Sequence, residues 1–421
     1  MNPIKEFFLD KMNIANKVSG SVFKWKYWLL YLSVFTLPMF MRLNNILLFA
    51  FILLGTLEII MNHKKYLVNH FLRAWPVWTF FVLAILGSFY GSEDIGIGFK
   101  NLERYWSFFL VPFVFVHGMV QYETKREQIF MSLVLGCVVT LLICYGNVVY
   151  EMIVGNEPLD YFFRWRHIGH QFTEIADTHP TYLGIFIVTS VLFMIQDKRI
   201  NAKLKYPIMV FLIFGLFQLA SRMALLLIVV FILYFFLLYL KKYKAQIALL
   251  ILGLIACSLL FNKLGSDYMK SRLFSKESIA DDKRFQRWEA SYQIFKENPF
   301  LGVGYTKIEE VRNNKYKQFG FNQAARQDLN AHNQLLEYLS RNGALGGFVY
   351  IISVFFLFLY SIYRKDYLFT FVFFAFILAN LTESMMVRIK GIEYFAIFTS
   401  LFLCHNLKPE LKSVSSYIKK V

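Results

Sequence analysis

The chain has 421 residues, of which 57% are hydrophobic, 19% aromatic and only 17% charged. This composition is far too apolar for a soluble globular protein, so soluble enzymes and soluble binding modules are excluded. The formal net charge of +17 reflects membrane topology and attraction to the membrane surface, and nothing in it indicates a nucleic-acid partner. We therefore expect an all-α, polytopic helical bundle embedded in a lipid bilayer.

Apolar stretches of about 16 to 22 residues with at most one charge predict about twelve membrane-spanning helices, within a range of about 11 to 13. In chain order, the predicted spans are 27–42, 45–62, 74–92, 104–121, 129–152, 180–196, 205–220, 222–240, 246–262, 343–362, 367–383 and 391–406. All four cysteines lie inside these spans, which indicates small apolar core residues rather than a disulfide framework.

The lysines and arginines predict the orientation. With a cytoplasmic N-terminus, the inside segments hold 23 Lys and Arg and the short outside loops hold 8. The other 14 lie in one long outside segment, which the positive-inside rule does not govern. This gives three parts: nine transmembrane helices in 1–262, a helical periplasmic loop in 263–342, and three further transmembrane helices with a cytoplasmic tail in 343–421.

The long loop contains one clear helical pattern. In "DDKRFQRWEASYQIFKENPFLGVGY", the apolar positions Phe285, Trp288, Tyr292 and Phe295 follow the helical period, and the helix should stop at 298–299. We expect these aromatic residues to form the buried face of an amphipathic helix. A second helix should begin near Asn330 and run through His332 and Glu337 to the Asn342–Gly343 turn, and an interfacial helix should cover "YFFRWRHIGHQF" in the shorter loop 153–178.

The segment 205–240 is short for two membrane crossings. Each crossing needs about 20 residues at about 1.5 Å per residue. The turn around "ASR" must therefore lie tight against, or slightly within, the outer face of the membrane that the helices cross. Arg222 is thereby expected at headgroup depth, where a lipid-linked phosphate would lie.

Several polar residues are predicted to gather on this outside face. They are His179, Tyr182, Ser221, Arg222, Arg284, Arg287, His332, Asn333, Glu383 and Arg388. Taken singly, each also fits a structural role, such as a snorkelling arginine or a capping histidine. Taken together, they indicate a site for pyrophosphate and a hydroxyl nucleophile, because arginine binds phosphate with two parallel hydrogen bonds and a neighbouring histidine can accept a proton.

From about Thr178 to Phe398, the chain resembles the O-antigen ligase and O-antigen polymerase superfamily of bacterial envelope proteins. The resemblance rests on the Ser221–Arg222 pair, on Arg284 and Trp288 before "NPFLGVG", and on "HNQLLEYLSRNGALGG", which begins at His332. The "NPFLGVG" and histidine motifs are fairly specific, whereas the serine-arginine pair alone is weak. Met223 stands where the family commonly has a small residue.

The resemblance implies an integral-membrane glycosyltransferase of the GT-C-like type in the bacterial inner membrane. Such an enzyme takes a glycan from undecaprenyl pyrophosphate on the periplasmic face and gives it to an acceptor hydroxyl. By this resemblance, Arg222 and Arg284 would hold the pyrophosphate and His332 would act as the base. Arg287, one helical turn from Arg284, could join them. Ser221, His179, Tyr182, Asn333, Glu383 and Arg388 complete the expected substrate-binding set.

No metal site or cofactor is expected, because the sequence shows no outside cluster with metal-ligand spacing; Asp281–Asp282 is better explained as a helix-start signal. Direct displacement would invert the anomeric carbon.

The leading hypothesis is an O-antigen ligase whose acceptor is the lipid A-core oligosaccharide. One alternative is a polymerase that uses a second lipid-linked repeat unit as acceptor. Another is a transporter or lipid flippase, although the position of the long loop and the scarcity of ionisable residues at mid-membrane argue against transport.

Overall fold

The computed structural model describes residues 24–61, 68–90, 94–264 and 284–406, and every regular element within them is helical. The longer helices are α2 (Trp25–Thr36), α3 (Met41–Met61), α5 (Trp75–Phe89), α6 (Ile95–Leu102), α7 (Ser107–His117), α9 (Arg126–Gly155), α11 (Pro180–Gln196), α12 (Ala202–Gln218), α13 (Arg222–Leu264), α16 (Arg284–Glu297), α17 (Gly304–Gln318), α19 (Gln334–Tyr363), α20 (Tyr367–Asn380) and α21 (Ile389–Asn406). Short elements are α4 (Val68–Arg73), η1 (Glu103–Tyr105), α8 (Met119–Thr124), η2 (Leu159–Phe163), η3 (Trp165–His167), α10 (His170–Thr173), η4 (Glu174–Ala176), α18 (Asn322–Arg326) and η5 (Met385–Val387).

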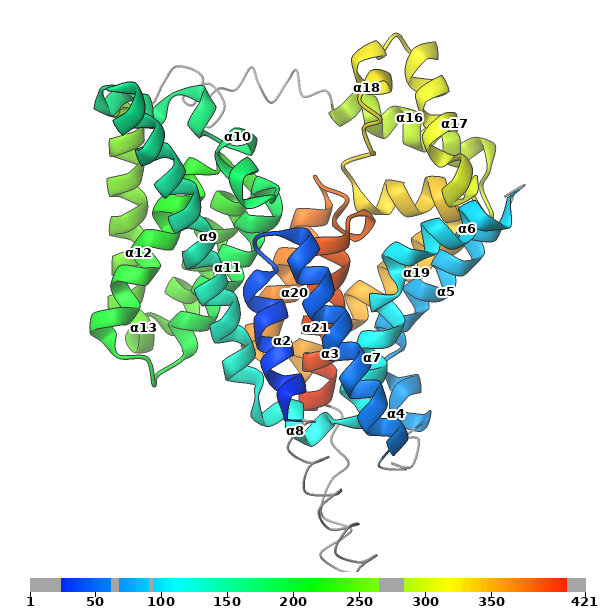
Figure 1. Ribbon diagram of the computed structural model, residues 1–421, viewed down its shortest axis with the longest axis horizontal. Helices are drawn as coiled ribbons and strands as arrows, with labels where there is room; N and C mark the ends of the chain where they lie inside the picture. The colour runs from blue at the N-terminus through cyan, green and yellow to red at the C-terminus, as the bar shows by residue number, and fades with distance from the viewer. Residues whose placement is uncertain (1–23, 62–67, 91–93, 265–283, 407–421) are drawn as a thin grey trace, which may run out of the picture.

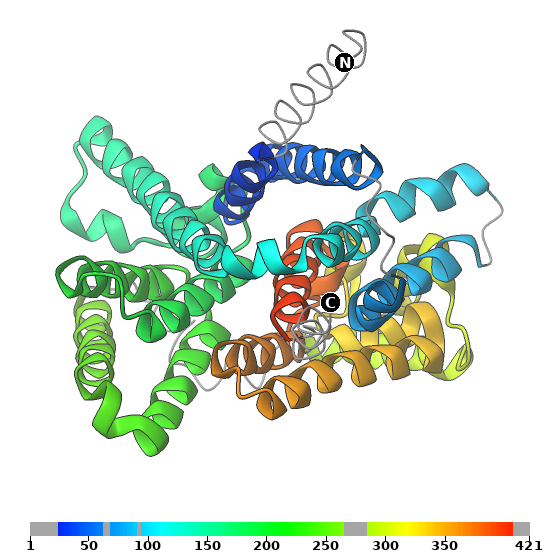
Figure 2. The same ribbon diagram turned by 90° about the horizontal axis from the view of Figure 1, so that it is seen from below.

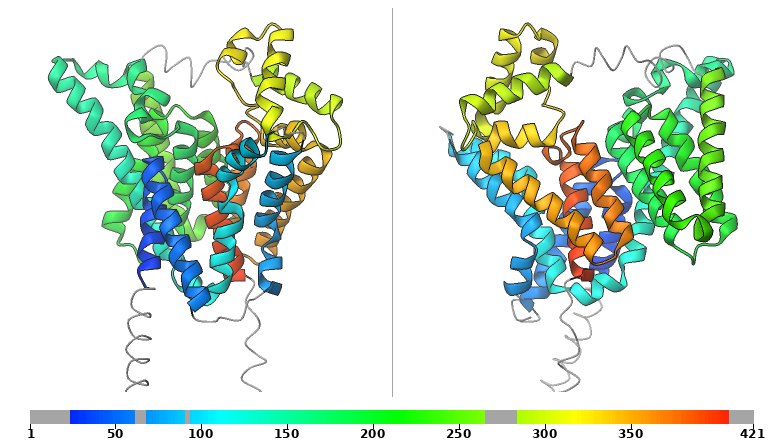
Figure 3. Two further views of the ribbon diagram at one scale, coloured as in Figure 1. Left: turned by 45° about the vertical axis from the view of Figure 1, so that its right-hand side comes forward. Right: turned by 180° about the vertical axis from the view of Figure 1, so that it is seen from behind.

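The helices form one elongated bundle with a small helical cap at one end. The segments α9 to α13 stand on one side, α2, α3, α20 and α21 lie in the middle, and α5, α7 and α19 form the other side (Figure 1). Seen from below, α21 lies near the centre of the bundle (Figure 2). The helices α16, α17 and α18 stand at the same end in both views of Figure 3.

Three described helices are long and apolar enough to cross a membrane: α3, α9 and α19. A fourth is reached if the bent pair His170–Ala176 and Pro180–Gln196 counts as one broken span. The described residues thus form an all-α structure with several helices capable of spanning a membrane, and each of the twelve predicted spans overlaps a helix. A count of twelve crossings remains a prediction.

The sequence prediction was wrong at three local points. α13 continues through 241–244, where a loop was expected, because this stretch of Lys and Tyr contains no Gly or Pro to end a helix. The stretch 159–176 forms short helical turns in place of one interfacial helix, broken where Arg164 and Gly169 leave helical geometry. α19 begins at Gln334, so His332 precedes this helix.

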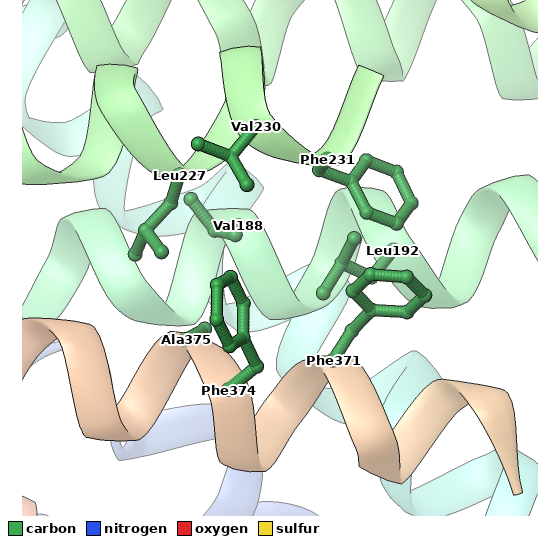
Figure 4. A pocket seen from close by; sticks show the side chains of 8 residues that line it. All are labelled: Val188, Leu192, Leu227, Val230, Phe231, Phe371, Phe374 and Ala375. Atoms are coloured by element: carbon green, nitrogen blue, oxygen red, sulfur yellow. The ribbon is translucent and has the colours of Figure 1, made fainter. Parts of the chain in front are cut away.

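α13 is joined to the rest of the bundle by apolar packing. Between α11, α13 and α20 lies a small pocket without polar lining (Figure 4), formed by Val188, Leu192, Leu227, Val230, Phe231, Phe371, Phe374 and Ala375. Burial of such side chains fixes the position of α13, and with it the start of this helix at Arg222 beside α11.

Candidate active site

Hydrogen bonds fasten the segment before α19 to the loop between α20 and α21. The backbone N–H of Asn333 donates to Ser384 Oγ at 3.2 Å, and its side-chain Nδ2 donates to the Leu381 carbonyl at 3.1 Å. The backbone N–H of Met386 donates to Gln334 Oε1 at 2.7 Å. Asn333 also caps α19, because its Oδ1 accepts from the backbone N–H of Leu336. The sequence placed Asn333 among the substrate-binding residues, and here it organises two loops.

His332 occupies a strained position immediately before that cap. Its φ of 48° lies in the left-handed region, which few residues other than glycine adopt. Its backbone N–H donates to Asn330 Oδ1 at 3.0 Å, and its carbonyl accepts from Trp288 Nε1 at 3.4 Å. The conformation directs the imidazole Nδ1 to within 3.0 Å of Glu383 Oε2. Strain held in this way by surrounding contacts is typical of functional positions.

Glu383 joins His332 to Arg284. Its buried carboxylate accepts a hydrogen bond from Arg284 Nη2 at 3.2 Å through Oε1 and faces His332 through Oε2. Burial alone would raise the pKa of Glu383, but His332, Arg284 and His179 more than offset it and hold the pKa at about 2. About a third of the Arg284 side chain stays exposed, at 34%. The three residues, predicted separately, therefore form one cluster with an accessible cation.

His179 and Tyr182 lie next to this cluster. His179 caps α11, with Nδ1 accepting from the backbone N–H of Thr181, and its ring meets the Tyr182 ring edge-on at 5.9 Å. Burial lowers the pKa of His179 to about 4, with Arg388 as a further lowering charge and Glu383 as a raising one. The imidazole is thus neutral at pH 7. Arg388 is exposed in the same loop as Glu383, and its charge acts on His179.

The serine-arginine pair stands at the turn between α12 and α13. This turn is short: α12 ends at Gln218 and α13 begins at Arg222, with Ala220 at a positive φ of 47°. Its depth in the membrane remains a prediction. Ser221 packs near Gly184 of α11, where an added Cβ would lie 3.5 Å from Ser221 Oγ. The Arg222 side chain lies outside the described part of the structure, so its role remains a prediction.

α16 buries a different face from the one expected. Phe285 and Tyr292 are exposed, whereas the buried residues of this helix are Arg287, Ala290, Ser291 and Ile294. The smaller side chains let α16 approach its neighbours α17 and α19 closely, and Trp288 and Phe295 are only half-buried. Arg287 lines a cavity together with residues 320–329. Its part in binding the pyrophosphate remains a prediction.

A buried ionic network supports the segment that carries His332. The Glu337 carboxylate accepts hydrogen bonds from Arg312 Nη2 of α17 at 2.7 Å and from Arg341 Nε at 2.7 Å. Its second oxygen accepts from the backbone N–H of Ala331 at 3.0 Å. Two guanidinium groups thus compensate the charge of this buried carboxylate. The sequence gave no signal for either arginine as a partner of Glu337.

The two glycine-containing motifs of the sequence pack against each other. The backbone N–H of Ala344 donates to the Pro299 carbonyl at 2.7 Å, so the two backbone segments are in direct contact. A Cβ on Gly343 (φ +62°) would lie 2.3 Å from the Phe300 backbone, and one on Gly302 (φ +67°) would lie 2.4 Å from the Arg341 backbone. "NPFLGVG" and "RNGALGG" thus form one structural unit that joins α16 to the kink of α19.

Among the described residues, no three His, Cys, Asp or Glu side chains are grouped so that they could hold a metal ion. Metal-independent chemistry remains a prediction, because the test for it is functional.

Comparison with known families agrees with the resemblance drawn from the sequence. Residues 207–351 match the family model described as O-antigen ligase. The matched segment includes Ser221, Arg222, Arg284 and His332, whereas Glu383 lies outside it. No curated protein sequence matches the chain.

Proposed function

We propose that this protein, a membrane protein of the O-antigen ligase superfamily by its segment 207–351, transfers a glycan from undecaprenyl pyrophosphate to an acceptor hydroxyl. The leading assignment is an O-antigen ligase acting on the lipid A-core oligosaccharide, at the periplasmic face of the bacterial inner membrane. The family supports glycan ligation or polymerisation as the class of reaction; donor, acceptor and location belong to the proposal.

The contact of His332 with Glu383 carries the proposal. A carboxylate 3.0 Å from Nδ1 favours the tautomer that has its proton on Nδ1, so that Nε2 is free to accept one. This is the arrangement of a general base with an orienting carboxylate. The ionised Glu383 would also stabilise the imidazolium that forms when the proton is taken.

The reaction follows from these roles. The acceptor hydroxyl oxygen attacks the anomeric carbon of the glycan, and its proton passes to His332 Nε2. The bond from the anomeric carbon to the pyrophosphate oxygen breaks, and the pyrophosphate leaves with the electron pair. Arg284 and Arg222 would hold the developing negative charge, and Arg388 adds a positive charge nearby. A single displacement of this kind inverts the anomeric carbon.

A polymerase needs the same pyrophosphate site and the same base, so the acceptor distinguishes the two assignments. The lipopolysaccharide profile of a deletion strain tests this directly. Loss of all polymer from the core, with lipid-linked polymer accumulating, indicates a ligase. A core that bears a single repeat unit indicates a polymerase. A normal profile together with lost export of a lipid-linked precursor would favour the transporter alternative.

The proposed topology has cytoplasmic ends, about twelve spans and a periplasmic segment 263–342. Its support is the excess of 23 over 8 Lys and Arg on the inside. A single cysteine at position 310, on the exposed side of α17, should react with an impermeant thiol reagent once the outer membrane is permeabilised. Labelling that requires disruption of the inner membrane would contradict this orientation.

A further inference from the structure

A polar cavity lies in the helical cap formed by α16, α17 and α18. It measures about 360 Å³ and lies between the first turn of α16 and the segment 320–329. Four of its lining side chains carry amides: Gln286, Asn322, Gln323 and Gln327. Arg287 and Phe321 also line the cavity. A cavity of this size falls within the range of small-ligand sites.

The composition of this lining selects a class of ligand. A side-chain amide offers two donors and a carbonyl acceptor, and a sugar hydroxyl likewise donates and accepts. Several amides in one cavity therefore suit a polyhydroxylated ring better than an anion or an apolar molecule. Phe321 is half-buried against Ala290, Tyr316 and Ala325, which holds its ring in place as an apolar surface for one face of the sugar.

The two segments that line the cavity, α16 and the residues 320–329, also lead to the candidate active site. Gln286 and Arg287 follow Arg284, the residue bound to Glu383, by two and three positions in α16. On the other wall, Leu329 stands three residues before His332, and the Tyr316 hydroxyl donates to its carbonyl at 3.1 Å. A ligand in the cavity would thus contact the two segments that carry the cation and the base.

We propose that this cavity, lined by Gln286, Arg287, Asn322, Gln323, Gln327 and Phe321, is a glycan-binding site. It holds a sugar residue of the polymer while the pyrophosphate or the acceptor hydroxyl lies at Arg284 and His332. The inference rests on the proposed function, and it adds the residues that recognise the sugar. Both the donor and the acceptor carry glycans, and the amide chemistry is common to them.

The test compares ligands with and without sugar on the full-length protein in lipid nanodiscs. The probes are undecaprenyl pyrophosphate, the glycan-bearing undecaprenyl lipid extracted from the deletion strain, and polymer-free lipopolysaccharide core from the same strain. The variant is Asn322→Ala combined with Gln327→Ala, both exposed at the cavity. Gln318→Ala, exposed at the end of α17 and outside the lining, is the matched control.

The double variant should weaken binding of one glycan-bearing probe by about tenfold, as expected for two lost hydrogen bonds, and leave binding of undecaprenyl pyrophosphate unchanged. A change with the undecaprenyl glycan assigns the donor sugar to the cavity, and a change with the core assigns the acceptor sugar. Unchanged binding of both glycans, or an equal loss for all three probes, overturns the proposal.

Arg284→Ala separates this result from the proposed function. It should weaken binding of undecaprenyl pyrophosphate and of the glycan-bearing lipid alike, because both carry the pyrophosphate. If the protein does not bind undecaprenyl pyrophosphate, or if Arg284→Ala leaves that binding unchanged, the proposed pyrophosphate site is wrong, whatever the cavity variants do.

Discussion

His332 Nδ1 lies 3.0 Å from Glu383 Oε2, and this contact joins the segment before α19 to the loop after α20. The same carboxylate accepts from Arg284 of α16, so one buried acid links the proposed base to the proposed pyrophosphate ligand. The position of Glu383 therefore controls both the orientation of the imidazole and the direction of the guanidinium.

Glu383→Gln should lower the transfer rate by about 100-fold or more, because a neutral amide neither fixes the histidine tautomer nor stabilises the imidazolium. The effect should fall mainly on kcat, and KM for the donor should change little. The comparison is with Glu310→Gln, an exposed residue of α17. A rate equal to that of this control would show that Glu383 is a structural ion-pair partner of Arg284 and no more.

Glu337→Ala should destabilise the protein by about 3 to 5 kcal/mol, because it leaves the buried Arg312 and Arg341 without their shared carboxylate. The exposed control Glu310→Ala should stay within about 0.5 kcal/mol of the parent. Thermal unfolding in detergent would show a clear loss of Tm for the first variant only. Equal Tm values for the two variants would mean that the network around Glu337 adds little to stability.

The pKa of His179 predicts a pH effect on stability. The folded protein holds this pKa at about 4, below the ordinary value of 6.5, so protonation favours the unfolded chain. The charged or titratable groups that face His179 are Glu383, Arg388, His170 and His332. Stability linked to His179 is complete above about pH 6.5 and falls as the pH decreases towards 4.

His179→Asn keeps a good capping residue for α11 and removes this titration. The parent should lose more Tm than the variant between pH 7 and pH 5, and Tm differences between the two proteins isolate the histidine from other groups. Parallel losses would show that His179 is exposed enough to protonate without cost.

The proposed charge neutralisation by arginine predicts that transfer survives chelation. Purified protein assayed with the glycan-bearing lipid donor should keep its activity in excess EDTA. Activity that disappears and returns with magnesium or manganese would contradict an arginine-only pyrophosphate site.

The apolar pattern of the sequence predicts the helices well, because a membrane span needs an unbroken apolar run whatever surrounds it. The predicted span 180–196 has the bounds of α11, and the one at 205–220 differs from α12 by two or three residues. Lys241–Lys244 misled the prediction, because a charged stretch between two apolar runs has the same composition whether it forms a loop or a helix.

The face of α16 shows a second limit of the sequence. Helical periodicity reveals that Phe285, Trp288, Tyr292 and Phe295 share one side, but it does not tell which side packs against the protein. In α16, the side with Ala290 and Ser291 is buried, because small residues permit close helix contact.

The candidate site was predictable as a set of residues but not as a geometry. The polar residues predicted on the outside face, together with the family resemblance, included His332, Arg284 and Glu383. Their pairing depends on the positive φ of His332 and on the hydrogen bonds that hold the loop after α20, and neither has a local signal in the sequence. The ionic network of Glu337 also lacks a local signal, because its partner Arg312 lies in another helix.

The central claim is that His332 is the general base of glycan transfer, and a comparison of donor binding with turnover in His332→Ala tests it most directly. The account predicts that the variant binds the glycan-bearing lipid donor almost as tightly as the parent and transfers about 10² to 10⁴ times more slowly. Turnover that is retained, or donor binding that falls in equal measure with turnover, would contradict it.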